Sequence, residues 1–271
     1  MDVDLHLPSG RLRARRWGAD GAPLLLCVHG ISANLTGWAW LAERLASRER
    51  QVVALDLRGR GRSDVTPPGS YGIDSHARDV LDAAAALGAD EFDVAGWSMG
   101  ALISIRVAGL DAARVHKLAL IDHAGRADDA AIDAVKAGFA RLDRVAPTPE
   151  AYIEPIRAAG AIDPWSPFWD AYYRYELEQQ PDGSWRPTTN RAACEEDLEK
   201  IGRIDWSPLT MPVALIRAKR PLGAGHVLPE ATRDEFLATV PQATLTEVDA
   251  GHFTVMTDDG TLGAIAELLE R

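Results

Sequence analysis

Hydrophobic positions in this chain form short apolar runs that alternate with longer helical patterns. Residues 3–7 and 12–17 alternate apolar and polar side chains and are separated by Pro8-Ser9-Gly10, which predicts a β-hairpin. The strands predicted after it are residues 24–28, 52–55, 92–95 and 117–121, and the helices are residues 38–46, 74–87 and 101–108. Strands spaced by single helices predict an α/β fold with a mostly parallel central sheet flanked by helices. In such sheets functional residues gather beyond the carboxyl ends of the strands.

The alternation stops after Ile121. Residues 125–205 are helical and polar, are punctuated by prolines and are rich in aromatic side chains. The sheet pattern then resumes with strands at 213–216 and 244–248, a helix at 230–239 between them, and a last helix that reaches residue 271. An insertion in the middle of an α/β pattern predicts a helical cap over the strand ends. The predicted division is an α/β core in two parts, 1–124 and 207–271, with a cap at 125–206.

Residues 96–100, Gly-Trp-Ser-Met-Gly, lie where a predicted strand meets a predicted helix. A serine at such a junction is typical of a nucleophile elbow, a turn so sharp that the serine adopts a strained backbone conformation. Its neighbours two residues away must lack bulk, and glycine stands at both positions. The turn lifts the Ser98 hydroxyl out of the sheet and directs the N-terminus of the next helix toward the group attacked. Ser98 is the candidate nucleophile, the alternative being a turn serine that glycines happen to flank.

Three further motifs accompany the elbow. His29-Gly30 follows the first long apolar strand, Asp-Leu-Arg-Gly-Arg-Gly-Arg-Ser at 56–63 follows the next, and Gly251-His252-Phe253 follows the last strand. With the four motifs in this order, the chain resembles the α/β-hydrolase fold family over nearly its whole length. The resemblance implies that family's fold, and it implies that residues 56–63 form a structural turn without a chemical role.

The resemblance also assigns the catalytic groups. Serine is a poor nucleophile on its own, so a base must take its proton, and the histidine after the last strand, His252, matches the family's base. The oxyanion that forms during attack needs fixed donors. The matching positions are the backbone N–H groups of Met99, which follows the nucleophile, and of Ile31, which follows His-Gly.

The base needs a carboxylate to orient it. In the family this acid usually lies in the loop after the penultimate strand, here residues 217–226, and that loop contains no carboxylate. Some subfamilies, notably haloalkane dehalogenases and certain lactone hydrolases, carry the acid after the strand that follows the elbow helix, which implies Asp122. Asp249 and Glu230 stay open as alternatives, and Asp122 could instead cap a turn.

Composition narrows the class of partner. The formal net charge of −11 disfavours nucleic acid and anionic membranes. The N-terminus lacks the apolar stretch of a signal peptide, and no run approaches the roughly 18 apolar residues of a membrane span. Cys27 lies in a predicted core strand and Cys194 in a predicted helix, so we expect no disulfide and a cytoplasmic location. The histidines show no metal-ligand spacing, and we expect neither a metal nor another cofactor.

A serine nucleophile predicts an acyl-enzyme. We expect hydrolysis of a small-molecule carboxylic ester, with a lactone as a specific case suggested by the position of the acid. The alternatives are a C–C bond hydrolase of a diketone-like substrate and a slow-turnover ligand receptor of the same fold. Trp97, Trp165 and Trp169 are predicted to line the substrate pocket, although core packing would explain each cap aromatic as well. His123 and His226 could also reach the mouth of the site, but a surface role is expected for each.

Overall fold

The computed structural model describes all residues from 1 to 271 and contains an eight-stranded sheet. The strand order is β1-β2-β4-β3-β5-β6-β9-β10. Only β2 runs antiparallel to its neighbours, and the other pairs are parallel. The strands are β1 (Asp2–Leu7), β2 (Gly10–Trp17), β3 (Leu24–Val28), β4 (Gln51–Leu55), β5 (Phe92–Trp97), β6 (Val115–Ile121), β9 (Val213–Ala218) and β10 (Ala243–Val248). The predicted hairpin and the mostly parallel sheet are confirmed.

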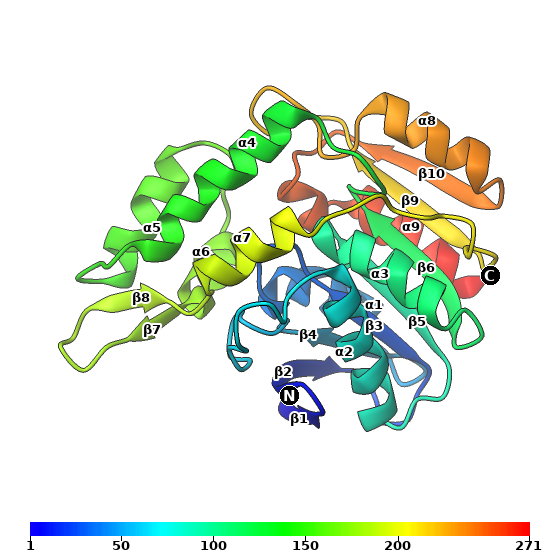
Figure 1. Cartoon of the computed structure of the whole chain (residues 1–271), viewed down its shortest axis with the longest axis horizontal. Coiled ribbons are helices and arrows are strands. Elements are labelled where there is room, and N and C mark those ends of the chain that lie inside the picture. Colours follow the sequence, from blue (N-terminus) through cyan, green and yellow to red (C-terminus); the bar gives the residue numbers. More distant parts are fainter.

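Helices cover both faces of the sheet, which Figure 1 shows as a three-layer arrangement. One face packs against α2 (Ile73–Ala86), α3 (Met99–Leu110) and α8 (Glu230–Thr239), and the other against α1 (Ala39–Leu45) and α9 (Asp259–Glu270). Since both faces are covered, β3 and β4 are buried along their whole length. A 3₁₀ turn at Leu35–Trp38 leads into α1.

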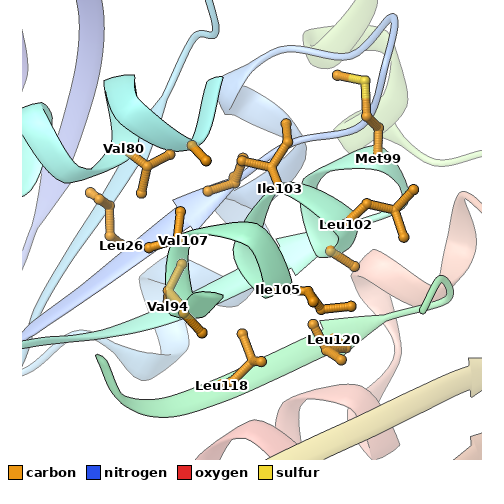
Figure 2. Close-up of a cluster of buried hydrophobic side chains, with 14 of the residues drawn as sticks. Leu26, Val80, Val94, Met99, Leu102, Ile103, Ile105, Val107, Leu118 and Leu120 are labelled. Carbon is orange, nitrogen blue, oxygen red and sulfur yellow. The ribbon is translucent and has the colours of Figure 1, made fainter. Parts of the chain in front are cut away.

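The helix after the elbow is apolar almost all round, as expected for a helix enclosed by other elements. Figure 2 shows its side chains against those of both neighbouring strands, with Val94 from β5 and Leu118 and Leu120 from β6 facing α3. Val80 approaches α3 from α2. This packing fixes the start of α3, and with it the position of the elbow relative to the sheet.

The segment between β6 and β9 forms a group of its own (Figure 1). It contains α4 (Asp129–Gly138), a 3₁₀ turn at Phe139–Asp143, α5 (Pro149–Ala158), α6 (Pro167–Glu176), β7 (Leu177–Gln179), β8 (Trp185–Pro187) and α7 (Arg191–Glu199). We call residues 125–206 the cap. That the cap is a separate domain stays a prediction. The sequence pattern predicted helices there and missed the short antiparallel pair β7–β8.

No helix has both the length and the apolar character needed to cross a membrane. Both cysteines are free and buried, Cys27 in β3 and Cys194 in α7. The side chains nowhere gather three or more histidine, cysteine or carboxylate groups in a way that could hold a metal ion.

Candidate active site

Ser98 stands in the sharp turn between β5 and α3 with a φ of +58°, a rare conformation for a residue with a side chain. Close backbone approaches surround the turn. A Cβ atom on Gly96 would lie 2.1 Å from the carbonyl oxygen of Gly100, and one on Gly100 would lie 2.1 Å from that of Val28. Neither position has room for a methyl group, which explains the two glycines around the serine.

The structure brings Ser98, His252 and Asp122 together although they are far apart in sequence. The Ser98 hydroxyl lies 3.0 Å from Nε2 of His252, and Nδ1 of the same ring lies 2.7 Å from Oδ2 of Asp122. All three residues are at least nine-tenths buried. The arrangement is a hydrogen-bonded relay that leads from a hydroxyl through an imidazole to a carboxylate.

Backbone contacts hold the two partners of the serine. Asp122 follows the last residue of β6 with a φ of +51°, and its Oδ1 accepts a hydrogen bond of 3.0 Å from the N–H of Ala218 at the end of β9. The indole N–H of Trp97 donates to the carbonyl of His252 at 3.0 Å. Adjacent strand ends therefore supply the groups that orient the acid and the base.

The alternative acids lie elsewhere. Asp249 is exposed and pairs with Arg220 at 3.0 Å, and this hydrogen bond lowers the pKa of Asp249. Glu230 is exposed in the first turn of α8 and has Arg217 4.0 Å away. Neither carboxylate contacts His252, so Asp122 is the acid that the structure places against the imidazole.

The predicted oxyanion donors lie on either side of the serine. Met99 is the first residue of α3, where N–H groups have no partner within the helix. The loop after β3 runs against the nucleophile, since a Cβ on Gly30 would lie 3.1 Å from Cβ of Ser98. Ile31 follows in this loop, and its N–H makes no backbone hydrogen bond. Both residues therefore lie next to the serine, and their role as oxyanion donors stays a prediction.

A cavity of about 700 Å³ opens onto Ser98 and His252. Trp97 lines it, as predicted, but Trp165 and Trp169 do not. Trp169 is fully buried with its ring edge-on to Phe253, and Trp165 stacks on a neighbouring tyrosine at 5.7 Å. The prediction for Trp169 was wrong because the face of α6 that turns inward depends on how the cap packs. The prediction for Trp165 was wrong because this residue lies in the segment before α6, where its ring packs on Tyr173. The aromatic lining from the cap is instead Tyr172 and Tyr173.

A second cavity, of about 1320 Å³, lies on the other side of α4 and contains neither Ser98 nor His252. His123 lines it and is 6% exposed, so the expectation of a surface histidine was wrong. Burial lowers the pKa of His123 to about 4, and the nearby His252 adds to this effect. His226 is half-buried and lines neither cavity.

Three arginines that no sequence motif marks, Arg141, Arg144 and Arg220, line the Ser98 cavity, where Asp163 is the only carboxylate. Arg141 pairs with the buried Glu176 at 3.2 Å, and Arg220 pairs with Asp249 at 3.0 Å. The side chain of Arg144 makes one hydrogen bond, of 3.4 Å to the backbone carbonyl of Tyr152, and no ion pair. It is the available positive charge of this cavity.

Comparison with known proteins shows the family of this chain. The family described as "alpha/beta hydrolase fold" matches residues 23–259. The chain therefore belongs to the α/β-hydrolase fold family. The fold carries many activities, so the substrate has to be argued from the site.

Among curated proteins, the chain is similar to the N-formylmaleamate deformylase of Pseudomonas putida, with 42% identity over 107 residues. That alignment covers 40% of this chain and 39% of the deformylase. It is also similar to Lipase LipV of Mycobacterium tuberculosis, with 29% identity over 93% of this chain and 92% of the lipase.

Solved structures show the same fold along the whole chain. The structure of E-2-(acetamidomethylene)succinate hydrolase matches with a TM-score of 0.89 and 22% identity, covering 100% of this chain and 99% of that one. The enol-lactonase from Burkholderia xenovorans LB400 matches with a TM-score of 0.73 and 21% identity, covering 99% of this chain and 100% of that one. At these identities the likeness concerns the fold.

Proposed function

We propose that the protein hydrolyses a small-molecule carboxylic ester, with lactones included, through an acyl-enzyme on Ser98. The observation that carries the proposal is a pair of contacts, 3.0 Å between Ser98 and His252 and 2.7 Å between His252 and Asp122. A serine with a hydrogen-bonded base, an oriented carboxylate and two free amides beside it has the parts that acyl transfer requires.

The proposed reaction has two halves. Nε2 of His252 takes the hydroxyl proton as Oγ of Ser98 bonds to the carbonyl carbon, and the N–H groups of Ile31 and Met99 hold the resulting oxyanion. The imidazolium, stabilised by Asp122, then gives its proton to the leaving alcohol oxygen, and the acyl group stays on the serine. A water molecule deprotonated by the same histidine releases the acid. For a lactone the two products are a single hydroxy acid.

A second candidate is hydrolysis of an amide in a substrate that carries a carboxylate. The observation that favours it is Arg144, which lines the Ser98 cavity without an acidic partner. Two proteins similar to this chain act, by name, on N-formylmaleamate and on E-2-(acetamidomethylene)succinate, which are N-acyl compounds with carboxylate groups. The same nucleophile, base and oxyanion donors would serve an amide carbonyl.

Labelling followed by a substrate panel tests both candidates. An alkyl fluorophosphonate should modify the protein at Ser98, and the variant Ser98→Ala should stay unlabelled. If the unaltered protein is not labelled, every proposal with a serine nucleophile fails, and a receptor of the same fold becomes the better explanation. Labelling without turnover on any substrate also favours a receptor.

The panel contains p-nitrophenyl esters, lactones, N-acyl amides with and without a carboxylate, and vinylogous diketones. Turnover confined to the diketones would favour the C–C hydrolase. Arg144→Gln separates the two acyl candidates, because it should lower kcat/KM about 10- to 100-fold for carboxylated substrates alone. Equal losses on neutral and carboxylated substrates would contradict the role of Arg144. The cytoplasmic location also stays a prediction, supported by two free cysteines.

A further inference from the structure

The loop that carries Ile31 is attached to the cap as well as to the core. The carbonyl oxygen of Ile31 accepts two hydrogen bonds, from Nε of Arg60 at 3.0 Å and from Sγ of Cys194 at 3.3 Å. Cys194 belongs to α7 in the cap, and Arg60 lies in the core loop after β4. The carbonyl of Ile31 belongs to the peptide group after this residue and its N–H to the one before it. Anchoring the carbonyl therefore fixes one side of the residue and limits how far φ and ψ of Ile31, and with them its N–H, can turn. That N–H is the proposed oxyanion donor.

The cap also determines where Arg60 points. Asp197, one turn after Cys194 on α7, accepts a hydrogen bond of 2.5 Å from Nη2 of Arg60. The other oxygen of Asp197 accepts from the backbone N–H of Gly72 at 2.5 Å, and Nε2 of His76 lies within 3.0 Å of both oxygens. The guanidinium is thus held at one end by α7 and donates at the other end to the oxyanion loop.

None of these side chains reaches the Ser98 cavity. Arg60, Asp197, His76 and Cys194 are fully buried, and none of them lines that cavity. Burial by itself would raise the pKa of Asp197, but the charge of Arg60 and the hydrogen bond from His76 outweigh it and lower the pKa to about 2. The aspartate is therefore ionised at neutral pH and keeps its arginine in place. Any effect of this cluster on the reaction must act through the loop.

We propose that Arg60 and Asp197, together with Cys194, are positioning residues that let the cap hold the oxyanion amide of Ile31 in its reactive direction. The inference rests on the proposed function, because it assumes that this amide stabilises an oxyanion on a substrate attacked by Ser98. An amide that points correctly stabilises the transition state more than the bound substrate. Loosening the loop should therefore lower kcat and leave KM nearly unchanged.

The same structure offers a matched control. Arg58 and Asp79 form a second buried pair, with Nη2 of Arg58 2.5 Å from Oδ1 of Asp79. Arg58 donates its remaining side-chain hydrogen bond to the carbonyl of Ser70, and neither side chain of this pair contacts the oxyanion loop. The one link to the positioning residues is the backbone carbonyl of Arg58, which accepts a hydrogen bond of 3.0 Å from Nη1 of Arg60 and is not altered by a substitution at Asp79. Asp79→Asn therefore removes a buried charge of the same kind without touching Ile31. Both variants should lose stability. A loss of activity seen only in Asp197→Asn is therefore due to the position of the loop and not to reduced stability.

The test compares Asp197→Asn with Asp79→Asn in the full chain. Three quantities are measured: kcat and KM on a p-nitrophenyl ester, and the rate constant for fluorophosphonate labelling of Ser98. Complete loss of one oxyanion donor costs about 100- to 1000-fold in kcat. For a donor that is only loosened we expect a fall of about 10- to 100-fold in kcat and in the labelling rate constant, with KM within about twofold. Asp79→Asn should stay within about threefold in all three.

Cys194 supplies a second pair of variants that keeps the core intact. Cys194→Ala removes the thiol donor to Ile31 and should lower kcat about threefold to tenfold, whereas Cys194→Ser keeps a donor and should restore it. Equal kcat values for the two would contradict the proposal. So would an Asp197→Asn variant that loses only as much activity as Asp79→Asn. Failure of the proposed function is seen separately, since the unaltered protein would then not be labelled.

Discussion

Asp122→Asn tests the assignment of the acid most directly, because the structure predicts which way the new amide would face. Oδ1 of Asp122 accepts a hydrogen bond from the N–H of Ala218, and Oδ2 faces Nδ1 of His252. The asparagine keeps the first bond only with its carbonyl oxygen toward Ala218. Its NH₂ group then faces Nδ1 and donates to it.

That donor changes the state of the imidazole. Nδ1 must become an acceptor, so the neutral ring carries its proton on Nε2, the atom that has to take the proton from Ser98. The corresponding substitution in the best-studied serine protease lowers kcat about 10⁴-fold through this wrong tautomer, which corresponds to roughly 5 kcal/mol in the barrier. We expect a loss of similar size here, because the geometry around His252 leaves no other acceptor for Nδ1.

The assay is kcat on an activated ester together with the rate of Ser98 labelling. Asp249→Asn is the control, since this carboxylate is exposed and bound to Arg220, and it should change kcat less than about threefold. Thermal unfolding of both variants checks that they are folded. The reasoning is refuted if Asp122→Asn keeps its activity while Asp249→Asn or Glu230→Gln loses it.

Three further predictions concern the architecture of the site. Gly100→Ala places a methyl group 2.1 Å from a backbone carbonyl of β3, so it should lower the free energy of unfolding by more than about 3 kcal/mol, as measured by urea denaturation. Trp97→Phe leaves the buried carbonyl of His252 without its donor and should cost about 1–3 kcal/mol of stability and about tenfold in kcat, seen by the same denaturation and an ester assay. The folded-state pKa of Asp197, about 2, lies below its ordinary value of 3.8, so its contribution to stability is present above about pH 4 and lost as the pH falls toward 2. Acid unfolding curves should be less steep for Asp197→Asn, and an unchanged acid branch would contradict this linkage.

Local steric demands made the elbow predictable. A serine at +58° in this sharp turn needs residues without side chains two positions away on each side, and the approach of 2.1 Å at Gly96 and Gly100 leaves room only for glycine there. The acid could be predicted for a related reason, since the carboxyl ends of parallel strands meet at one edge of the sheet. The loop after β9 contains no carboxylate. Asp122, just after the end of the neighbouring strand β6, was therefore the predicted acid.

Properties of the cap could not be predicted in the same way. An aromatic-rich helical segment shows which residues are large, but the side of α6 that faces the cavity depends on how the cap packs against the core. Trp169 therefore lies in the core where a pocket position was predicted, and Tyr172 lines the cavity. The burial of His123 and the short β7–β8 pair were missed for the same reason, since each depends on contacts between distant segments.

By itself the sequence determined the order of strands and helices along the chain and predicted the elbow with Ser98 and His252 as its base, because these depend on periodicity, on local backbone geometry and on motifs of neighbouring residues. It left Asp122, Asp249 and Glu230 open as the acid, and the tertiary structure places Asp122 against His252. Only the tertiary structure decided which cap residues face the substrate and how α7 reaches the loop of Ile31. Arg60 and Asp197 are 137 residues apart. They are in contact because α7 packs against the loop after β4 in the folded protein, and no local sequence pattern predicts a contact between segments so far apart.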